Sequence, residues 1–137
     1  RRGVPIRIDY TFGPDLSPPW EEEIEWLHVQ GSTTHQEVVF FHKETKTLIL
    51  TDLIENFEKK QVSFWLWPLL RLAGNVDPDG KMPVDMARTF QKGKAHLRDS
   101  VLHMLSWAPE CIIIAHGRWY DKNGVAELKR AFRKVLT

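Results

Sequence analysis

Two apolar runs of the sequence end at residues that can bind a metal ion or exchange a proton. Asp52 directly follows the run TLILT at residues 47–51, and His116 directly follows the run CIIIA at residues 111–115. In layered α/β folds, ligands bind beyond the carboxyl ends of the strands. If the two runs are neighbouring parallel strands, the carboxylate and the imidazole lie close enough to share a metal ion or a water molecule.

Both residues also have ordinary structural interpretations. An aspartate after a strand commonly forms a turn or caps a helix through hydrogen bonds to the backbone, and residue chemistry alone favours that interpretation for Asp52. A histidine satisfied by hydrogen bonds is likewise more common than a ligand, although a glycine follows His116 and permits close approach. No role is assigned to His28, His42, His96 and His103, and Cys111 is expected to pack rather than react.

Hydrophobic periodicity predicts the elements that would position these residues. Strands are expected over 4–10, 24–30, 37–42, 47–51 and 111–115, and helices over 61–73, over 84–107 and after a cap at Asp121 or Asn123. The runs at 38–41 and 48–50 are typical of strands covered on both faces, and the polar residues 42–46 between them suit a hairpin. Strands followed by helix, helix, strand and helix predict an α/β layered domain.

Composition limits the classes of protein to consider. The 137 residues are 42% hydrophobic and 27% charged, which fits one domain over residues 1–137 that buries a core without metal or disulfide staples. A formal net charge of +1 argues against a nucleic-acid partner. One cysteine, no signal peptide and no apolar stretch of transmembrane length predict a cytoplasmic protein. A start at Arg1 without methionine suggests a piece of something longer.

Three segments carry a resemblance to a known family. HQEVVFFH at 35–42, TLILTDLIENF at 47–57 and IIAHGR at 113–118, with the closing helix, resemble an uncharacterised family described as a domain of unknown function. That family is similar to the metallo-β-lactamase superfamily, and the resemblance extends from about Trp20 onward. It implies that the chain is the C-terminal half of an αββα sandwich, with a mixed sheet and flanking helices.

The resemblance also implies a metal site. Asp52 falls on the aspartate that bridges two metals in the superfamily, and His116 falls on its last metal-binding histidine. His35 falls near the histidine that precedes the strand pair, although counting back from VVFF places that ligand nearer Thr33. The metal would be zinc or iron. The His-x-His-x-Asp-His cluster that supplies most of the ligands is absent from these residues and would belong to a preceding N-terminal half.

A ligand count follows from this assignment. With His35 on one metal, His116 on the other and Asp52 bridging, each metal has two ligands from this chain, whereas a catalytic zinc usually keeps three. An active enzyme would therefore need ligands from the N-terminal half or from another subunit.

The predicted helix over 61–73 has almost no polar face. Trp65 and Trp67 would form part of an apolar patch that is larger than a soluble monomer normally exposes. Three interpretations explain what covers this patch: it packs in the core beneath an N-terminal half, it forms a homodimer interface, or it contacts a membrane surface. The helix lacks the basic face typical of membrane-surface helices, which argues against the third interpretation.

The sequence and the resemblance suggest two alternative functions. The first is a metallo-β-lactamase-like hydrolase acting on a small-molecule substrate, in which a metal-activated water attacks an ester-like bond. The alternative is a non-catalytic relative that acts as a binding or assembly module through the surface around Trp65 and Trp67.

Overall fold

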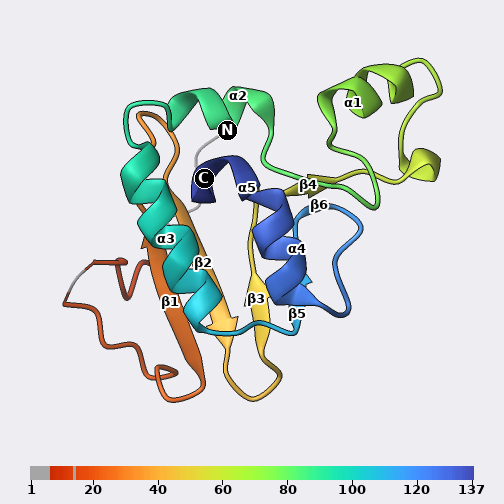
Figure 1. The fold of residues 1–137 in the computed structure, drawn as a ribbon. Helices are drawn as coiled ribbons and strands as arrows, with labels where there is room; N and C mark the ends of the chain where they lie inside the picture. Colours follow the sequence, from red (N-terminus) through yellow and green to blue (C-terminus); the bar gives the residue numbers. More distant parts are fainter. Residues whose placement is uncertain (1–6, 14) are drawn as a thin grey trace.

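The computed structural model describes residues 7–13 and 15–137, and its centre is a mixed four-stranded sheet (Figure 1). The strand order is β1 (Ile24–Val29), β2 (Glu37–His42), β3 (Thr47–Ile49) and β5 (Cys111–Ile113). The pairs β1–β2 and β2–β3 are antiparallel, with the expected hairpin between β2 and β3, whereas β3 and β5 are parallel. The predicted mixed α/β architecture is confirmed, and β3 and β5 are the parallel neighbours that the site requires.

Helices cover one face of this sheet. Figure 1 shows α3 (Lys94–Ser106), α4 (Gly124–Ala131) and α5 (Arg133–Leu136) on the same side of the strands. Residues of β2 alternate between buried and half-buried, as expected for a strand with one packed face. The other face of β2 is partly covered, because the rings of Phe12 and Trp20 contact the ring of Phe40. Their ring centroids lie 5.6 and 6.1 Å from that of Phe40.

The core lies between the sheet and the helices. Val39, Leu48 and Ile112, from three adjacent strands, are fully buried, and α3 contributes Val101 and Met104, which are also fully buried. Leu128 and Phe132 close the core from the C-terminal helices with 0% and 1% exposure. Burial of this apolar surface is the main favourable contribution to folding.

The prediction of a single helix over 84–107 is wrong. The structure has two helices, α2 (Val84–Thr89) and α3, separated by a turn that ends at Gly93. The backbone of Gly93 packs directly against that of Gly31, where a Cβ on either residue would collide. Gly93 therefore marks a break between two helices and a close approach of two backbone segments.

The helix predicted over 61–73 is shorter than expected. A short 3-10 helix, η1 (Lys59–Gln61), is followed by α1 (Trp67–Ala73), which has Pro68 in its first turn, where the missing N–H is tolerated. Figure 1 shows α1 projecting away from the sheet. The C-terminal helix follows Asn123 as predicted, but Asn123 makes no side-chain capping hydrogen bond and the helix is interrupted at Phe132.

Two strand predictions also need correction. Residues 4–6 of the strand expected over 4–10 lie outside the described residues, and residues 7–10 form no regular element, with Ile8 75% exposed. In contrast, a second sheet that was not predicted pairs β4 (Glu55–Asn56) with β6 (His116–Gly117) in parallel.

None of the helices in residues 7–13 and 15–137 has the length and apolar character needed to cross a bilayer.

Candidate functional site

Asp52 and His116 lie together at one edge of the sheet. The Nε2 atom of His116 is 3.0 Å from Oδ1 of Asp52, and each side chain is about half exposed (51% and 50%). Parallel pairing aligns Ile49 with Ile113, and the backbone hydrogen bond from the Ala115 N–H to the Thr51 carbonyl, at 3.2 Å, extends the alignment to the site. The carboxylate and the imidazole therefore meet as the strand ends predicted, and Asp52 pairs with a side chain.

A buried glutamate holds the segment that carries Asp52. Glu37, at the start of β2, is 6% exposed, and its Oε1 accepts a hydrogen bond from the Thr51 N–H at 2.7 Å. Its Oε2 accepts a second hydrogen bond from the Thr51 hydroxyl at 2.5 Å. Charge-assisted hydrogen bonds of this kind are stronger than neutral ones, so Glu37 fixes the chain one residue before Asp52.

Sequence reasoning missed Glu37, although a signal for it was present. Glu37 lies in phase with Val39 and Phe41, the residues of β2 that point into the core. A carboxylate at an inward position of a strand needs hydrogen-bond donors close by, which is the kind of exception that marks a positioning residue.

The short second sheet positions His116. Its neighbour Gly117 has a φ of +102°, and a Cβ there would collide with the carbonyl oxygen of Asn56 on the paired strand. Only glycine allows β6 to approach β4 in this way. The ring centroid of Phe57, which follows β4, lies 6.4 Å from that of His116, and the two rings are tilted by 32°.

Asn56 ties this region to the following loop. Its side chain is fully buried and donates to the Arg118 carbonyl at 2.8 Å and to Asp77 Oδ1 at 3.2 Å, while its Oδ1 accepts from the Gly80 N–H at 3.1 Å. Each polar atom of this buried amide is satisfied, so the position of β6 is set by a connected network.

His35 does not join the pair. Its Nδ1 contacts the Thr34 hydroxyl at 3.1 Å, and its backbone N–H donates to the Ser32 hydroxyl at 2.8 Å, in the turn before β2. Throughout residues 7–13 and 15–137, no three His, Cys, Asp or Glu side chains are arranged to hold a metal ion.

The pair fits a divalent metal in chemistry and spacing, but it supplies only two ligands. Imidazole nitrogen and carboxylate oxygen are ordinary ligands of zinc at about 2.0–2.2 Å, so two such atoms on one ion lie roughly 3–3.5 Å apart. The Nε2 to Oδ1 distance of 3.0 Å falls in this range. A catalytic zinc usually keeps three protein ligands, so this pair could supply only part of such a site.

The segment around α1 presents an apolar surface of a different kind. Phe64 and Leu72 are 88% and 87% exposed, and Trp65 and Leu69 are 62% and 61% exposed. Trp67 is half-buried. We call Phe64, Trp65, Leu69 and Leu72 the apolar arm; the rest of the described chain leaves it largely uncovered.

Comparison with known families gives one match. Residues 3–93, about two thirds of the chain, match the family described as a domain of unknown function (DUF4336). The match includes His35 and Asp52 but ends before His116, so it begins earlier and stops sooner than the resemblance seen in the sequence. No curated protein matches the chain. Neither result links it to the metallo-β-lactamase superfamily, whereas the family match covers more than half of the residues. The chain belongs to the DUF4336 family of domains of unknown function.

Proposed function

We propose that the chain is a hydrolase domain of the metallo-β-lactamase type, in which Asp52 and His116 contribute two ligands to a zinc or iron site. One observation carries the proposal: a carboxylate and an imidazole meet at 3.0 Å beyond the ends of the parallel strands β3 and β5. Ligand sites in layered α/β folds are found at this position. Because the described residues supply no third ligand, the proposal requires one from outside them.

Each residue of the site has a defined part in this proposal. Nε2 of His116 can carry the hydrogen that pairs it with Asp52 or can bind a metal ion, but not both, so a metal ion would replace the contact of Nε2 with Asp52. Glu37 holds the Asp52 segment through Thr51, and Gly117 sets the position of His116 on β4. Asp52 and His116 would hold the metal, and the chemistry it would supply is activation of a water molecule for attack on an ester-like bond.

Metal binding tests the proposal directly. The full-length protein is stripped of metal and titrated with zinc in competition with a chromophoric chelator. We expect near-stoichiometric binding that weakens by at least about 100-fold in Asp52→Ala and in His116→Ala, because losing a ligand costs more than losing its supporting partner.

Two controls match these variants. His42→Ala removes a histidine at the other end of β2, where it contacts Thr45, and Asp99→Ala removes an exposed aspartate on α3. Both should bind zinc as the wild type does. A wild-type protein that binds no zinc, or equal binding by all four variants, would contradict the proposal.

The apolar arm favours a second candidate function, assembly with another copy of the chain. Four large apolar side chains at 61% exposure or more on one short segment are unusual for a monomer. In this case the sandwich-like domain would be a non-catalytic module, and metal-free protein with both site variants folding normally would support it.

Sedimentation measurements test the second candidate. We expect a concentration-dependent dimer that Phe64→Ser combined with Leu72→Ser converts to a monomer. Substitution of Leu102, which is 42% exposed on α3, by serine is the matched control and should leave the dimer intact. A wild-type protein that stays monomeric at tens of micromolar would exclude self-assembly through the apolar arm.

A further inference from the structure

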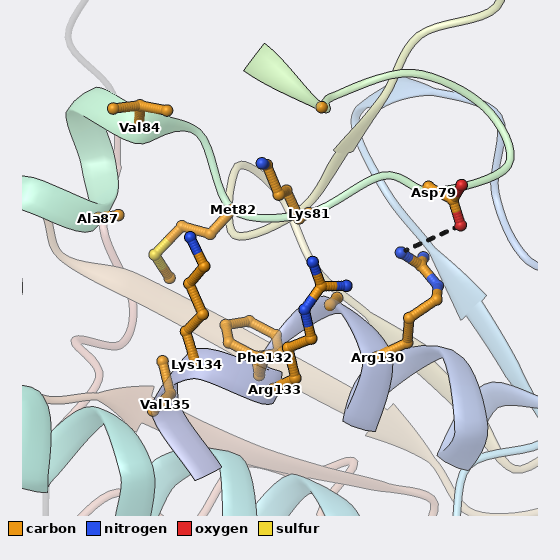
Figure 2. A pocket seen from close by; sticks show the side chains of 12 residues that line it. Asp79, Lys81, Met82, Val84, Ala87, Arg130, Phe132, Arg133, Lys134 and Val135 are labelled. Atoms are coloured by element: carbon orange, nitrogen blue, oxygen red, sulfur yellow. Dashed lines mark ion pairs between the residues drawn. The ribbon is translucent and has the colours of Figure 1, made fainter. Parts of the chain in front are cut away.

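A cavity of about 420 Å³ lies away from the Asp52–His116 pair. One wall is the segment from Lys81 to Ala87, which leads into α2, and the other is the C-terminal part of the chain from Arg130 to Val135. Figure 2 shows Arg133 and Lys134 extending from α5 towards the segment that carries Lys81 and Met82. Neither Asp52 nor His116 lines it, so the cavity is a separate candidate site.

The charged residues of the cavity are mostly cations. Lys81, Arg130, Arg133 and Lys134 line it, against the single carboxylate of Asp79. Arg130 is already engaged, because its Nε donates to Glu127 Oε2 at 2.8 Å and its Nη1 is 3.9 Å from Asp79 Oδ1. Within the part of the chain that the structure describes, no carboxylate forms an ion pair with the other three. We call Lys81, Arg133 and Lys134, with the cavity they line, the cationic pocket.

The three cations are close enough to affect one another. Burial lowers the pKa of the Lys81 ammonium, and the neighbouring Lys134 and Arg133 lower it further. Like charges held together without a counter-charge favour an anion that enters between them.

The remaining lining is apolar. Met82 and Phe132 are 8% and 1% exposed, and Val84, Ala87 and Val135 complete the surface. A ligand that fills this space therefore meets cations on one part and hydrocarbon on another. Concave sites of several hundred cubic ångströms with this mixture are typical for small molecules.

We propose that the cationic pocket binds a small organic phosphate, with the phosphate between Lys81, Arg133 and Lys134 and an apolar portion against Met82 and Phe132. A phosphate monoester carries close to two negative charges and several strong acceptors, which suits three cations better than a carboxylate does. An arginine adds the planar fork that binds phosphate oxygens in pairs. Because the buried side chains of Met82 and Phe132 line a cavity, the site suits a small soluble ligand better than a membrane surface.

Isothermal titration with three probes tests the proposal on the full-length protein. Phenyl phosphate carries both recognition elements, inorganic phosphate lacks the apolar part, and benzoate lacks the second charge. We expect phenyl phosphate to bind with a dissociation constant below about 1 mM at low salt, and more tightly than either of the other two.

Variants locate the binding. Arg133→Gln and Lys134→Gln remove exposed cations and should each weaken phenyl phosphate binding about tenfold or more, the usual value of a charge-assisted hydrogen bond. Lys129→Gln is the matched control, because Lys129 is exposed on α4 and does not line the cavity. It should change the affinity less than twofold.

Three outcomes would overturn the proposal. The first is the absence of phenyl phosphate binding to the wild type, and the second is equal weakening by Lys129→Gln, which would indicate a diffuse charge effect. The third is binding to vesicles that contain phosphatidic acid without binding to phenyl phosphate, which would assign the cations to a lipid surface. Arg133, Lys134 and Lys129 make no contact with Asp52 or His116, so zinc binding should not change in these variants and this proposal is tested independently of the metal site.

Discussion

The Asp52–His116 pair and the cationic pocket differ in whether their charged side chains have partners. In the pair, a carboxylate and an imidazole satisfy each other at 3.0 Å and are about half exposed. In the pocket, three cations face a cavity and no carboxylate of the described chain pairs with them. The difference separates a site whose polar groups contact each other before any ligand binds from one that gains a counter-charge on binding.

One short strand lies between the two sites. Glu55 of β4 pairs with His116 on one side and with Lys81 on the other, where the backbone hydrogen bonds are 3.0 and 3.1 Å. Neighbouring strands are about 4.8 Å apart, so the backbones of His116 and Lys81 are about two strand spacings apart. They share a scaffold, while each depends on a different kind of side-chain support.

The largest expected effect is that of replacing Gly117, which would disrupt the pairing of β4 with β6 beside the Asp52–His116 pair. Gly117→Ala should lower the free energy of unfolding by more than about 3 kcal/mol, since a side chain is strained at this positive φ and meets the Asn56 carbonyl. Chemical denaturation measures the loss. Gly13→Ala is the control, because a Cβ there has no atom within 4 Å, and an equally stable Gly117 variant would show that β4 and β6 are not tightly paired.

The next effect concerns Tyr120, whose hydroxyl accepts a hydrogen bond from Arg130 Nη2 at 3.1 Å beside the cationic pocket. Burial raises the pKa of Tyr120 from 10.0 to about 12. The folded state holds the phenol proton more tightly than the unfolded state does. This stabilising contribution is therefore complete below pH 10 and is lost as the pH rises towards 12, by roughly 2 kcal/mol.

Tyr120→Phe should remove this alkaline loss of stability. Denaturation curves recorded between pH 9 and about 12 would measure it. Tyr10→Phe is a matched control, because Tyr10 is 62% exposed, and its variant should keep the wild-type pH dependence. If Tyr120→Phe also keeps the wild-type pH dependence, the Tyr120 hydroxyl is open to water.

A smaller effect is expected for Glu37. Its replacement compares the buried carboxylate that supports the Asp52 segment with the exposed Asp52–His116 contact. Glu37→Ala should lower the free energy of unfolding by about 1.5 kcal/mol, because two hydrogen bonds to a buried carboxylate are lost. Glu44→Ala in the exposed β2–β3 turn should change it very little. Indistinguishable denaturation midpoints for the two variants would mean that Glu37 does not hold Thr51.

The smallest effect is expected for the Asp52–His116 contact itself. Because both side chains are about half exposed, a double-mutant cycle should give a coupling energy below about 1 kcal/mol that decreases further in high salt. A coupling energy of several kcal/mol would identify the pair as a structural ion pair, and its contrast with the cationic pocket would disappear.

Much of the sheet could be predicted from local patterns. The apolar runs at 37–42, 47–51 and 111–115 became β2, β3 and β5, because β-branched and aromatic residues suit a pleated, buried surface. The helix over 84–107 was predicted wrongly because periodicity continues through its break. The turn between α2 and α3 ends at Gly93, which packs against Gly31, a residue more than sixty positions earlier.

The site was predictable in part for the same reason. Asp52 and His116 stand where apolar runs end, so their place at a sheet edge follows from position in the sequence. Glu37 and Asn56 act through residues far away in the chain, such as Thr51 and Arg118, and nothing local to either shows which backbone groups it will meet. His35 fell only near the ligand position that the family resemblance implied, and its own turn places it apart from the pair.

Residue types and their order therefore settled that the segments of β1, β2, β3 and β5 become strands and that Asp52 and His116 follow β3 and β5, because burial and alternation act over a few neighbours. The pairing of β3 with β5, the approach of Gly117 to Asn56 and the meeting of Lys81 with Arg133 and Lys134 were decided only by the folded chain. These contacts join segments from distant parts of the sequence, and their energies depend on distances that exist only after the core has formed.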